Sequence, residues 1–361
     1  MKAYKTELAP NNKQKAFFYG CAGAKRYVFN WGLATWKEWY EGGERKPSRF
    51  GLCKHFNSIK DELCPWIRQY PYAVTESAFE NLGRAFDGFF RRVKRGETPG
   101  YPKFKKRGRK DSFALRNVGV FVDGVRLTGI GRVRLKERAY IPADAVYGVY
   151  AAISRSADRW FISVLVKEEI EPGYPVGEPI GVDFGIKEIA TCSDGTVFEN
   201  PRILKSAEKK LASLQRELAR RKQGGENWKK TRKKVQRQYA KVARTRRHVQ
   251  HQVSHYVTAQ GARAIVLEDL NVSGMVKNHC LAKAINDVGF YELRRQVEYK
   301  AEWAGAEVVF ADRWYASSKT CSGCGCVNKD LTLSDRIYVC PECGFEIDRD
   351  LNAALNLARL A

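Results

Sequence analysis

The stretch Ile180-Gly181-Val182-Asp183-Phe184-Gly185 decides the fold prediction, because it places one acidic residue at the end of an apolar run. A short apolar run of this kind, bounded by turn residues, indicates a buried β-strand. A second run, Ala264-Ile265-Val266-Leu267, ends in Glu268. A carboxylate at the end of a buried strand is costly unless it is solvated, paired or bound to metal. Both strand ends are therefore candidate functional positions.

A third acid, Asp350, stands at the start of a predicted C-terminal helix. From residue 180 onward the pattern predicts a strand at 180–185, a second at 188–192, a hairpin turn at 193–195 and a third strand from 196. A basic helical tract follows from about 203 to 260, interrupted at 224–225. The remaining predicted elements are a strand at 264–268, a helix at 291–304, a strand at 308–311 and a helix at 351–360. This order matches an RNase H-like α/β layout. In that layout the positions of the three acids meet.

Three converging carboxylates form a hard-oxygen site of the kind that Mg²⁺ or Mn²⁺ prefers. A pair of such ions can activate water and stabilise the leaving oxygen in phosphodiester hydrolysis. Each acid also has a structural interpretation: Asp183 as a turn residue, Glu268 as an exposed strand end, and Asp350 as a helix N-cap near Asp348. The order of the elements favours the shared metal site.

The cysteines point to a second metal. Cys321 and Cys324 form one CxxC pair, and Cys340 and Cys343 form another, with fifteen residues between the pairs. This spacing is typical of a tetrahedral zinc site with four thiolate ligands, and it disfavours disulfides or a chance cluster. Cys326 is surplus and is interpreted as a non-ligand. Such a zinc site is usually structural, so it identifies a module and not a reaction.

The amino-acid composition indicates which class of molecule the protein binds. The 361 residues include 64 Lys and Arg against 40 Asp and Glu, which gives a formal net charge of +24. A surface this basic attracts polyanions, so nucleic acid is the leading partner class. No stretch approaches the roughly 20 apolar residues of a membrane span, and the N-terminus has no apolar signal region. We therefore expect no membrane partner and a cytoplasmic location.

Two basic segments are candidate nucleic-acid contacts. The first is Lys229–Lys234, continued on the same helical tract by further cations and interleaved with aromatic residues: Arg237, Lys241, Arg244, Arg246, Arg247, Trp228 and Tyr239. Such a tract would neutralise phosphates, and no acid lies between 229 and 247 to pair with it. The second is Lys103–Lys110, where Tyr101 and Phe104 can stack on bases. A solvated helix face and a solvated linker are the respective alternatives.

The first 170 residues are predicted to be a β-rich unit with a helical unit inserted after its first strand, 3–8. An apolar stripe predicts a pair of amphipathic helices and is interpreted as core: Phe17, Phe18, Cys21, Ala24, Tyr27, Val28, Trp31, Leu33 and Trp36. Further helices are expected at 55–63 and 74–93, with a loop at 65–71 between them. Strands are expected at 118–122, 125–127, 132–135 and 160–166. A Pro- and Gly-rich stretch, 172–179, predicts a domain boundary.

Together these residues resemble the TnpB (OrfB) family of transposon-encoded, RNA-guided DNA endonucleases, which are related to compact type V CRISPR effector nucleases. The similarity covers nearly the whole chain. Its most specific elements are these: Gly181-Val182-Asp183-Phe184-Gly185, Leu267-Glu268-Asp269-Leu270-Asn271, Tyr299-Lys300-Ala301-Glu302-Trp303 and Asp348-Arg349-Asp350-Leu351-Asn352-Ala353-Ala354. The N-terminal part is carried by Asn11-Asn12-Lys13-Gln14, 24–31 and Pro102-Lys103-Phe104-Lys105.

The resemblance implies a multidomain α/β chain. A β-barrel wedge domain would span 1–10 and 111–170, with a helical recognition domain, 11–110, inserted in it. An RNase H-like (RuvC) nuclease domain would span 171–361 and carry a zinc-ribbon insert at 317–347. Cys321, Cys324, Cys340 and Cys343 would bind Zn²⁺.

The resemblance also implies that Asp183, Glu268 and Asp350 hold Mg²⁺ or Mn²⁺, with Asp348 as the alternative third ligand. A guide RNA would select a double-stranded DNA target by base pairing, and the protein would recognise a short motif beside it. We therefore expect an RNA-guided DNA endonuclease associated with the nucleoid of a prokaryote, in which Arg336 reaches the scissile phosphate or is a plain surface arginine. A strand-joining transposase, a catalytically silent nucleic-acid-binding regulator and a guide-free nuclease are the alternatives, and the oligomeric state stays open.

Overall fold

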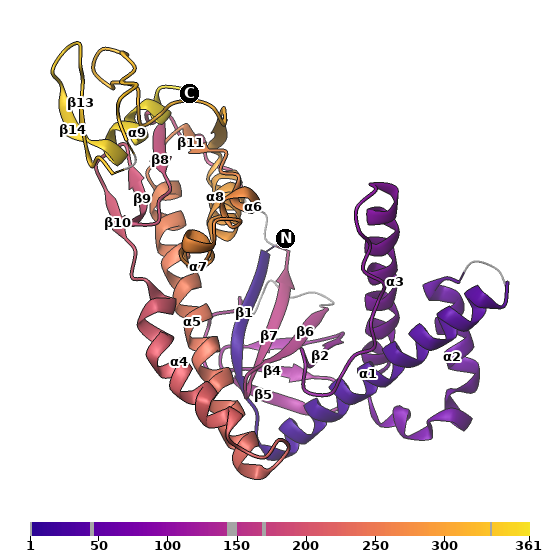
Figure 1. Ribbon diagram of the computed structural model, residues 1–361. Helices are drawn as coiled ribbons and strands as arrows, with labels where there is room; N and C mark the ends of the chain where they lie inside the picture. Colours follow the sequence, from indigo (N-terminus) through magenta and orange to yellow (C-terminus); the bar gives the residue numbers. More distant parts are fainter. Residues whose placement is uncertain (1, 44–46, 143–149, 168–170, 333) are drawn as a thin grey trace. The chain divides into compact units, whose positions relative to one another are not determined.

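The computed structural model describes residues 2–43, 47–142, 150–167, 171–332 and 334–361. The chain divides into two compact units, Met1–Glu169 and Ile170–Ala361. In Figure 1 the first unit runs from indigo to magenta and the second continues to yellow. Within the described ranges, no helix has both the length and the apolar character that a membrane span requires.

The first unit contains one antiparallel sheet of seven strands, in the order β2-β6-β7-β1-β5-β4-β3. Its strands are β1 (Lys2–Ala9), β2 (Ser112–Leu115), β3 (Gly119–Phe121), β4 (Gly124–Leu127), β5 (Gly131–Leu135), β6 (Ala151–Ser156) and β7 (Arg159–Val166). The N-terminal strand lies in the middle, paired with β7 from Lys2 to Leu8 and with β5 at its end. Five of these strands were predicted, whereas β2 and β6 were missed because their short runs show no clear alternation.

The helices of the first unit are α1 (Asn12–Glu41), α2 (Arg49–Leu63), a 3-10 helix (Pro65–Gln69) and α3 (Tyr72–Lys94). The predicted pair of helices over the apolar stripe is wrong, because α1 is a single helix. Asn11 caps it in a capping box with Gln14. A glycine inside α1 serves packing and does not break the helix: a Cβ at Gly32 would lie 3.1 Å from Leu82. The predicted loop at 65–71 is also wrong, because the 3-10 helix occupies most of it.

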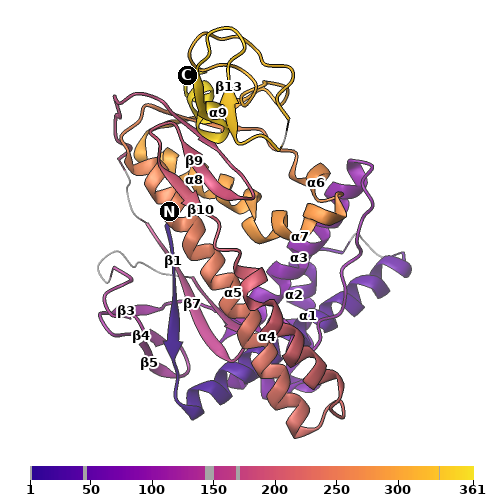
Figure 2. The same cartoon turned by 60° about the vertical axis from the view of Figure 1, so that its left-hand side comes forward.

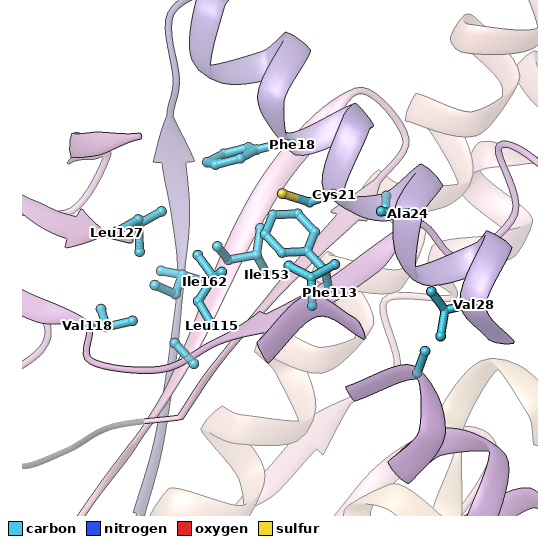
Figure 3. Close-up of a cluster of buried hydrophobic side chains, with 14 of the residues drawn as sticks. Phe18, Cys21, Ala24, Val28, Phe113, Leu115, Val118, Leu127, Ile153 and Ile162 are labelled. Atoms are coloured by element: carbon cyan, nitrogen blue, oxygen red, sulfur yellow. The ribbon is translucent and has the colours of Figure 1, made fainter. Parts of the chain in front are cut away.

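The core of the first unit joins the helices to the sheet. Phe18 of α1 packs with its ring centroid 5.2 Å from that of Trp160 on β7 and 5.7 Å from that of Phe113 on β2. Figure 3 shows Phe18 and Cys21 directed toward the side chains of the sheet. Further along α1, the indole of Trp36 stacks on Phe86 of α3 at 3.9 Å. The interpretation of the apolar stripe as core is therefore confirmed.

The second unit is built on a mixed sheet with the order β10-β9-β8-β11-β12. Its strands are β8 (Ile180–Asp183), β9 (Glu188–Cys192), β10 (Val197–Glu199), β11 (Ala264–Glu268) and β12 (Glu307–Ala311). β8, β11 and β12 are parallel, and β9 and β10 return as antiparallel hairpins. All five strands agree with the prediction. Leu267 lies opposite Val182 in the register, so Glu268 and Asp183 leave the sheet side by side.

Six helices and a small two-stranded ribbon complete the described part of this unit: α4 (Ile203–Ala219), α5 (Glu226–Ala259), α6 (Val272–Met275), α7 (His279–Val288), α8 (Phe290–Ala304), α9 (Arg349–Ala358), β13 (Ile337–Val339) and β14 (Glu346–Asp348). The basic tract is the side-by-side helix pair α4 and α5 (Figure 2), broken near 224–225 as predicted. The short helices α6 and α7 were not predicted.

Helix α9 packs directly on β8 at Gly181. A Cβ on this glycine would lie 2.0 Å from the carbonyl oxygen of Ala354 and 2.5 Å from the amide nitrogen of Ala358. Backbone atoms cannot rotate away as a side chain can, so only glycine allows this approach. The contact places the first turn of α9 beside the end of β8.

We predict that Gly181→Ala destabilises the second unit by about 3 kcal/mol, which lowers its melting temperature by roughly 10 °C. The matched control is Gly88→Ala in α3, where a Cβ meets no atom within 4 Å. That change should raise the stability of the first unit by about 0.5–1 kcal/mol, because alanine is the better helix former. Thermal unfolding followed by circular dichroism measures both. Equal stability of Gly181→Ala and wild type would contradict the packing described for α9.

Candidate active site

Three acidic side chains line one cleft of about 950 Å³ in the second unit. Asp183 comes from the end of β8, Glu268 from the end of β11, and Asp350 from the first turn of α9. The carboxyl ends of adjacent parallel strands meet at one edge of a sheet, and the close contact at Gly181 brings the helix to that edge. The structure therefore brings together the three acids singled out in the sequence.

The three carboxylates interact electrostatically. Burial, followed by the negative charges of Glu268 and Asp350, raises the pKa of Asp183 to about 8. The guanidinium of Arg349 opposes this shift. A buried carboxylate that resists ionisation beside two other carboxylates marks a place where positive charge is favourable. The donor set, oxygen atoms alone, suits a hard divalent cation.

Asp350 and Asp348 have different partners. Asp348 is the N-cap of α9 and accepts hydrogen bonds from the backbone N–H groups of Asp350 at 2.9 Å and Leu351 at 3.0 Å. The N-cap interpretation of Asp350 is therefore wrong, and that role belongs to Asp348. Asp350 instead receives a hydrogen bond from Arg349 at 3.0 Å and lies 4.0 Å from the guanidinium of Arg336.

Glu268 and its neighbour Asp269 also differ. Glu268 accepts a hydrogen bond from the hydroxyl of Ser317 at 2.6 Å. Asp269 accepts from Arg294 at 3.1 Å and from Arg313 at 2.5 Å, and these guanidinium groups hold its pKa below the usual range. Asp269 is thus committed to ion pairs, whereas Glu268 lines the cleft. Arg349 and Ser317 were not predicted as site residues. The one sequence signal for Arg349 is its position next to Asp350, and for Ser317 its position four residues before Cys321.

Cationic side chains line the same cleft. Besides Arg336 and Arg349 they are Lys187, Arg202, Lys205 and Lys283, and the acids Glu208 and Asp287 lie among them. Lys283 forms an ion pair with Glu208. Arg202 adopts a left-handed backbone conformation, with φ of 45°, immediately before α4. One cleft therefore contains both the three acids and several cationic side chains, a combination that suits a phosphate chain approaching a cation-dependent centre.

The four predicted cysteine ligands form one cluster. The Sγ atoms of Cys321, Cys324, Cys340 and Cys343 all lie within 4.8 Å of one another. Individual Sγ–Sγ distances are 3.8 Å between Cys321 and Cys343 and 3.5 Å between Cys324 and Cys340. These distances fit four thiolates around one ion with metal–sulfur bonds of about 2.3 Å. Cys326 does not belong to this group, as predicted.

Backbone amides support the cluster. The N–H groups of Cys343 and Glu342 lower the pKa of Cys340 to about 6, which favours the thiolate that binds metal. On the other knuckle, the N–H of Gly323 donates to Cys321 Sγ at 3.3 Å. The donor set and its spacing fit a zinc ion.

The two basic segments differ in how free their side chains are. On α5, Arg246 binds Asp287 of α7 at 2.6 Å and is structural, and Arg232 lies over the ring of Trp228. In the first unit, Asn30 of α1 holds the backbone of Lys105 by two hydrogen bonds, at 2.8 and 3.0 Å. The backbone of Lys105 therefore anchors its segment to α1, while the other cations of the segment 103–110 can contact a ligand.

The raised pKa of Asp183 predicts a pH dependence for the metal-free acidic cleft. The native carboxyl binds its proton more tightly than the unfolded one, so the contribution of Asp183 to stability is most favourable below about pH 4 and is lost as the pH rises toward about 8. Asp183→Asn should abolish this loss and raise the melting temperature at pH 9 by about 5 °C. The control is Asp330→Asn, at an exposed position of the same unit. Melting curves from pH 5 to 9 without added Mg²⁺ or Mn²⁺ measure the effect; parallel curves for Asp183→Asn and wild type would contradict it.

Comparison with known proteins gives three family matches. Residues 161–279 match the family described as "Probable transposase", and residues 290–357 match "Cas12f1-like, TNB domain". Residues 1–45 match a family described as "Helix-turn-helix domain". Within the described part of that last range, the structure has strand β1 and the single helix α1.

Two solved structures share the fold. One is the Cas12f1-sgRNA-target DNA complex, with a TM-score of 0.58, 14% identity, and coverage of 96% of this chain and 83% of that chain. The other is the mini-RNA-guided endonuclease CRISPR-Cas_phi3, with a TM-score of 0.57, 10% identity, and coverage of 99% and 92%.

Two full-length relatives carry closely similar names. "Putative RNA-guided DNA endonuclease InsQ" of Escherichia coli is 32% identical over 99% of this chain and 91% of its own length. "Putative RNA-guided DNA endonuclease" of Streptomyces pristinaespiralis is 32% identical over 99% and 88%. The chain belongs to the TnpB (OrfB) family of RNA-guided DNA endonucleases.

Proposed function

We propose that this protein is an RNA-guided DNA endonuclease of transposon origin that hydrolyses phosphodiesters at the three acids of the cleft. The observation that carries the proposal is the meeting of Asp183, Glu268 and Asp350 in one cleft that cationic side chains also line. Family membership supports the substrate class, because the full-length relatives are named RNA-guided DNA endonucleases. The protein would act on DNA in the cytoplasm of a prokaryote.

The three carboxylates would hold Mg²⁺ or Mn²⁺. Their oxygen donors fit such an ion, and its positive charge would offset both the burial of Asp183 and the repulsion from Glu268 and Asp350 that raise the pKa of Asp183. When bound, the divalent cation supplies activation of water and neutralisation of charge at the phosphate. Asp348 is disfavoured as a ligand because its carboxylate caps α9. The four thiolates would hold a structural Zn²⁺.

The remaining residues of the cleft would orient the DNA strand. Lys187, Arg202 and Lys205 would contact phosphates upstream or downstream of the cut, because they line the same cleft as the three acids. Arg336 lines the same cleft, and its guanidinium lies near Asp350 with about half of its side chain exposed. It would therefore be able to turn toward the scissile phosphate, to which a planar guanidinium can donate two hydrogen bonds.

The domain assignment follows from the family. Residues 171–361 would be a RuvC-like nuclease domain with the zinc ribbon at 317–347. Residues 1–10 and 111–170 would form the β-barrel wedge domain around the helical recognition domain, 11–110. A guide RNA and a double-stranded DNA target would be the partners, held in part by the exposed cations of α5.

Cleavage of a guide-matched DNA duplex tests the function. Asp350→Asn removes the charge that the metal needs and should reduce the cleavage rate by about 100-fold or more, with DNA binding retained. Asp348→Asn is the matched control, because asparagine is an equally good N-cap and should leave cleavage near the wild-type rate. Fluorescently labelled duplex, with and without Mg²⁺, measures both. Full cleavage by Asp350→Asn, or its loss in Asp348→Asn alone, would contradict the assignment.

Guidance is tested by sequencing the RNA that co-purifies with the protein. A discrete RNA species, whose removal abolishes target-specific cutting, is expected. Cutting that is unaffected by RNA removal would indicate a guide-free nuclease. The family description "Probable transposase" gives a second candidate, strand joining. Joined products from purified protein would favour it over hydrolysis, and binding without cleavage by the wild type would indicate a silent regulator.

A further inference from the structure

The segment between β12 and the first cysteine knuckle, residues 312–320, touches both candidate metal sites. We call it the connecting segment. Ser317 lies in its middle, is 4% exposed, and donates its hydroxyl hydrogen to Glu268 at 2.6 Å. The segment ends directly before Cys321, which is fully buried in the cysteine cluster. One short stretch of chain thus joins an acid of the cleft to a thiol of the zinc site.

Two buried asparagines of α9 hold this segment. Asn352 and Asn356 are 0% and 1% exposed, and their side-chain amides both donate to the carbonyl oxygen of Thr320, at 2.7 and 2.6 Å. Asn356 also donates to the carbonyl oxygen of Ser317 at 2.8 Å. Asn352 accepts from the N–H of Ser322, inside the knuckle, at 2.9 Å. Buried backbone groups without such partners are costly, so the network resists local displacement.

The same helix carries the third acid. Asp350 stands two residues before Asn352, at the start of α9. At the other end of the helix, Arg359 donates to the carbonyl oxygen of Ser322. Helix α9, the connecting segment and the knuckle therefore form one hydrogen-bonded body that contains Asp350 and contacts Glu268. Asp183 joins it through the close packing of α9 on Gly181.

We infer that Ser317 is a positioning residue for Glu268, and that ion occupancy at the four thiolates sets the affinity of the acidic cleft for its divalent cation. Without an ion the four thiols lose their common ligand, and Cys321 no longer holds the end of the connecting segment. The hydroxyl of Ser317 then loses its fixed direction toward Glu268. Outer contacts of this type typically change metal affinity by about 10–100-fold. This inference rests on the proposed function, since it assumes that the cleft binds a divalent cation.

The test measures Mn²⁺ binding directly, by electron paramagnetic resonance of the free ion, on the full zinc-loaded chain. Ser317→Ala should weaken Mn²⁺ binding about 10–100-fold, while its zinc content stays at one per chain. At saturating Mn²⁺ its cleavage rate should recover toward wild type, because the change acts on metal affinity. Ser322→Ala is the matched control. It removes a buried hydroxyl from the same ribbon but keeps the hydrogen bond that the backbone N–H of residue 322 donates to Asn352.

A second arm removes the zinc. Zinc-depleted wild-type protein should bind Mn²⁺ about 10-fold or more weakly, with the circular dichroism of its helices retained. In Ser317→Ala, zinc depletion should weaken Mn²⁺ binding by a clearly smaller factor than in wild type, because the two changes interrupt the same connection. Equal costs in both proteins would show two independent effects and would overturn the inference.

The outcomes separate this inference from the proposed function. Wild-type protein should show Mn²⁺ binding that Asp183→Asn abolishes, and it should cleave DNA. If it shows neither, the proposed function fails and the inference fails with it. If wild type does both, and Ser317→Ala binds Mn²⁺ within 2-fold of wild type, the inference alone is overturned. Equal weakening by Ser322→Ala and Ser317→Ala would also overturn it, since the effect would then be general to the ribbon.

Discussion

The parallel pairing of β8 with β11 is the constraint on which the rest of the site depends. Leu267 lies opposite Val182, so the next residue on each strand, Glu268 and Asp183, leaves the sheet at the same edge. A slip of one residue would direct one of these carboxylates to the other face of the sheet. Gly181 then determines how close Asp350 lies to the other two acids, because only a residue without Cβ lets α9 approach β8 closely enough to bring Asp350 to that edge. Three acids that are far apart in the sequence therefore share one cleft.

This convergence explains how a chain with a net charge of +24 keeps an acidic centre. The cations lie on the wall of the cleft and along α5, where they can attract a phosphate chain. In the proposed function the acids lie where that chain would be cut, and burial together with the charges of Glu268 and Asp350 raises the pKa of Asp183. The two kinds of charge would then have complementary roles, because the cations would attract the strand and the carboxylates would hold the ion that allows it to approach.

The sequence was sufficient to predict the strands of the second unit and the meeting of the three acids in one cleft. The signal was the order of the elements, which brings together the ends of two apolar runs and the start of the C-terminal helix. The sequence was also sufficient for the four cysteines, whose spacing is itself the signal. It did not show which of Asp348 and Asp350 caps α9 and which lines the cleft, since both acids suit the start of a helix. Strands β2 and β6 were missed because four to six residues without alternation carry little information. Ser317 was missed because its role comes from a tertiary contact.

Anomalous X-ray scattering from crystals of the protein soaked in Mn²⁺ tests directly whether the three acids share one metal site. We expect manganese density bonded to carboxylate oxygens of Asp183, Glu268 and Asp350 at about 2.0–2.3 Å, and a separate zinc peak at the four thiolates. Manganese density bound by Asp348 in place of Asp350, or none at the ends of β8 and β11, would contradict it.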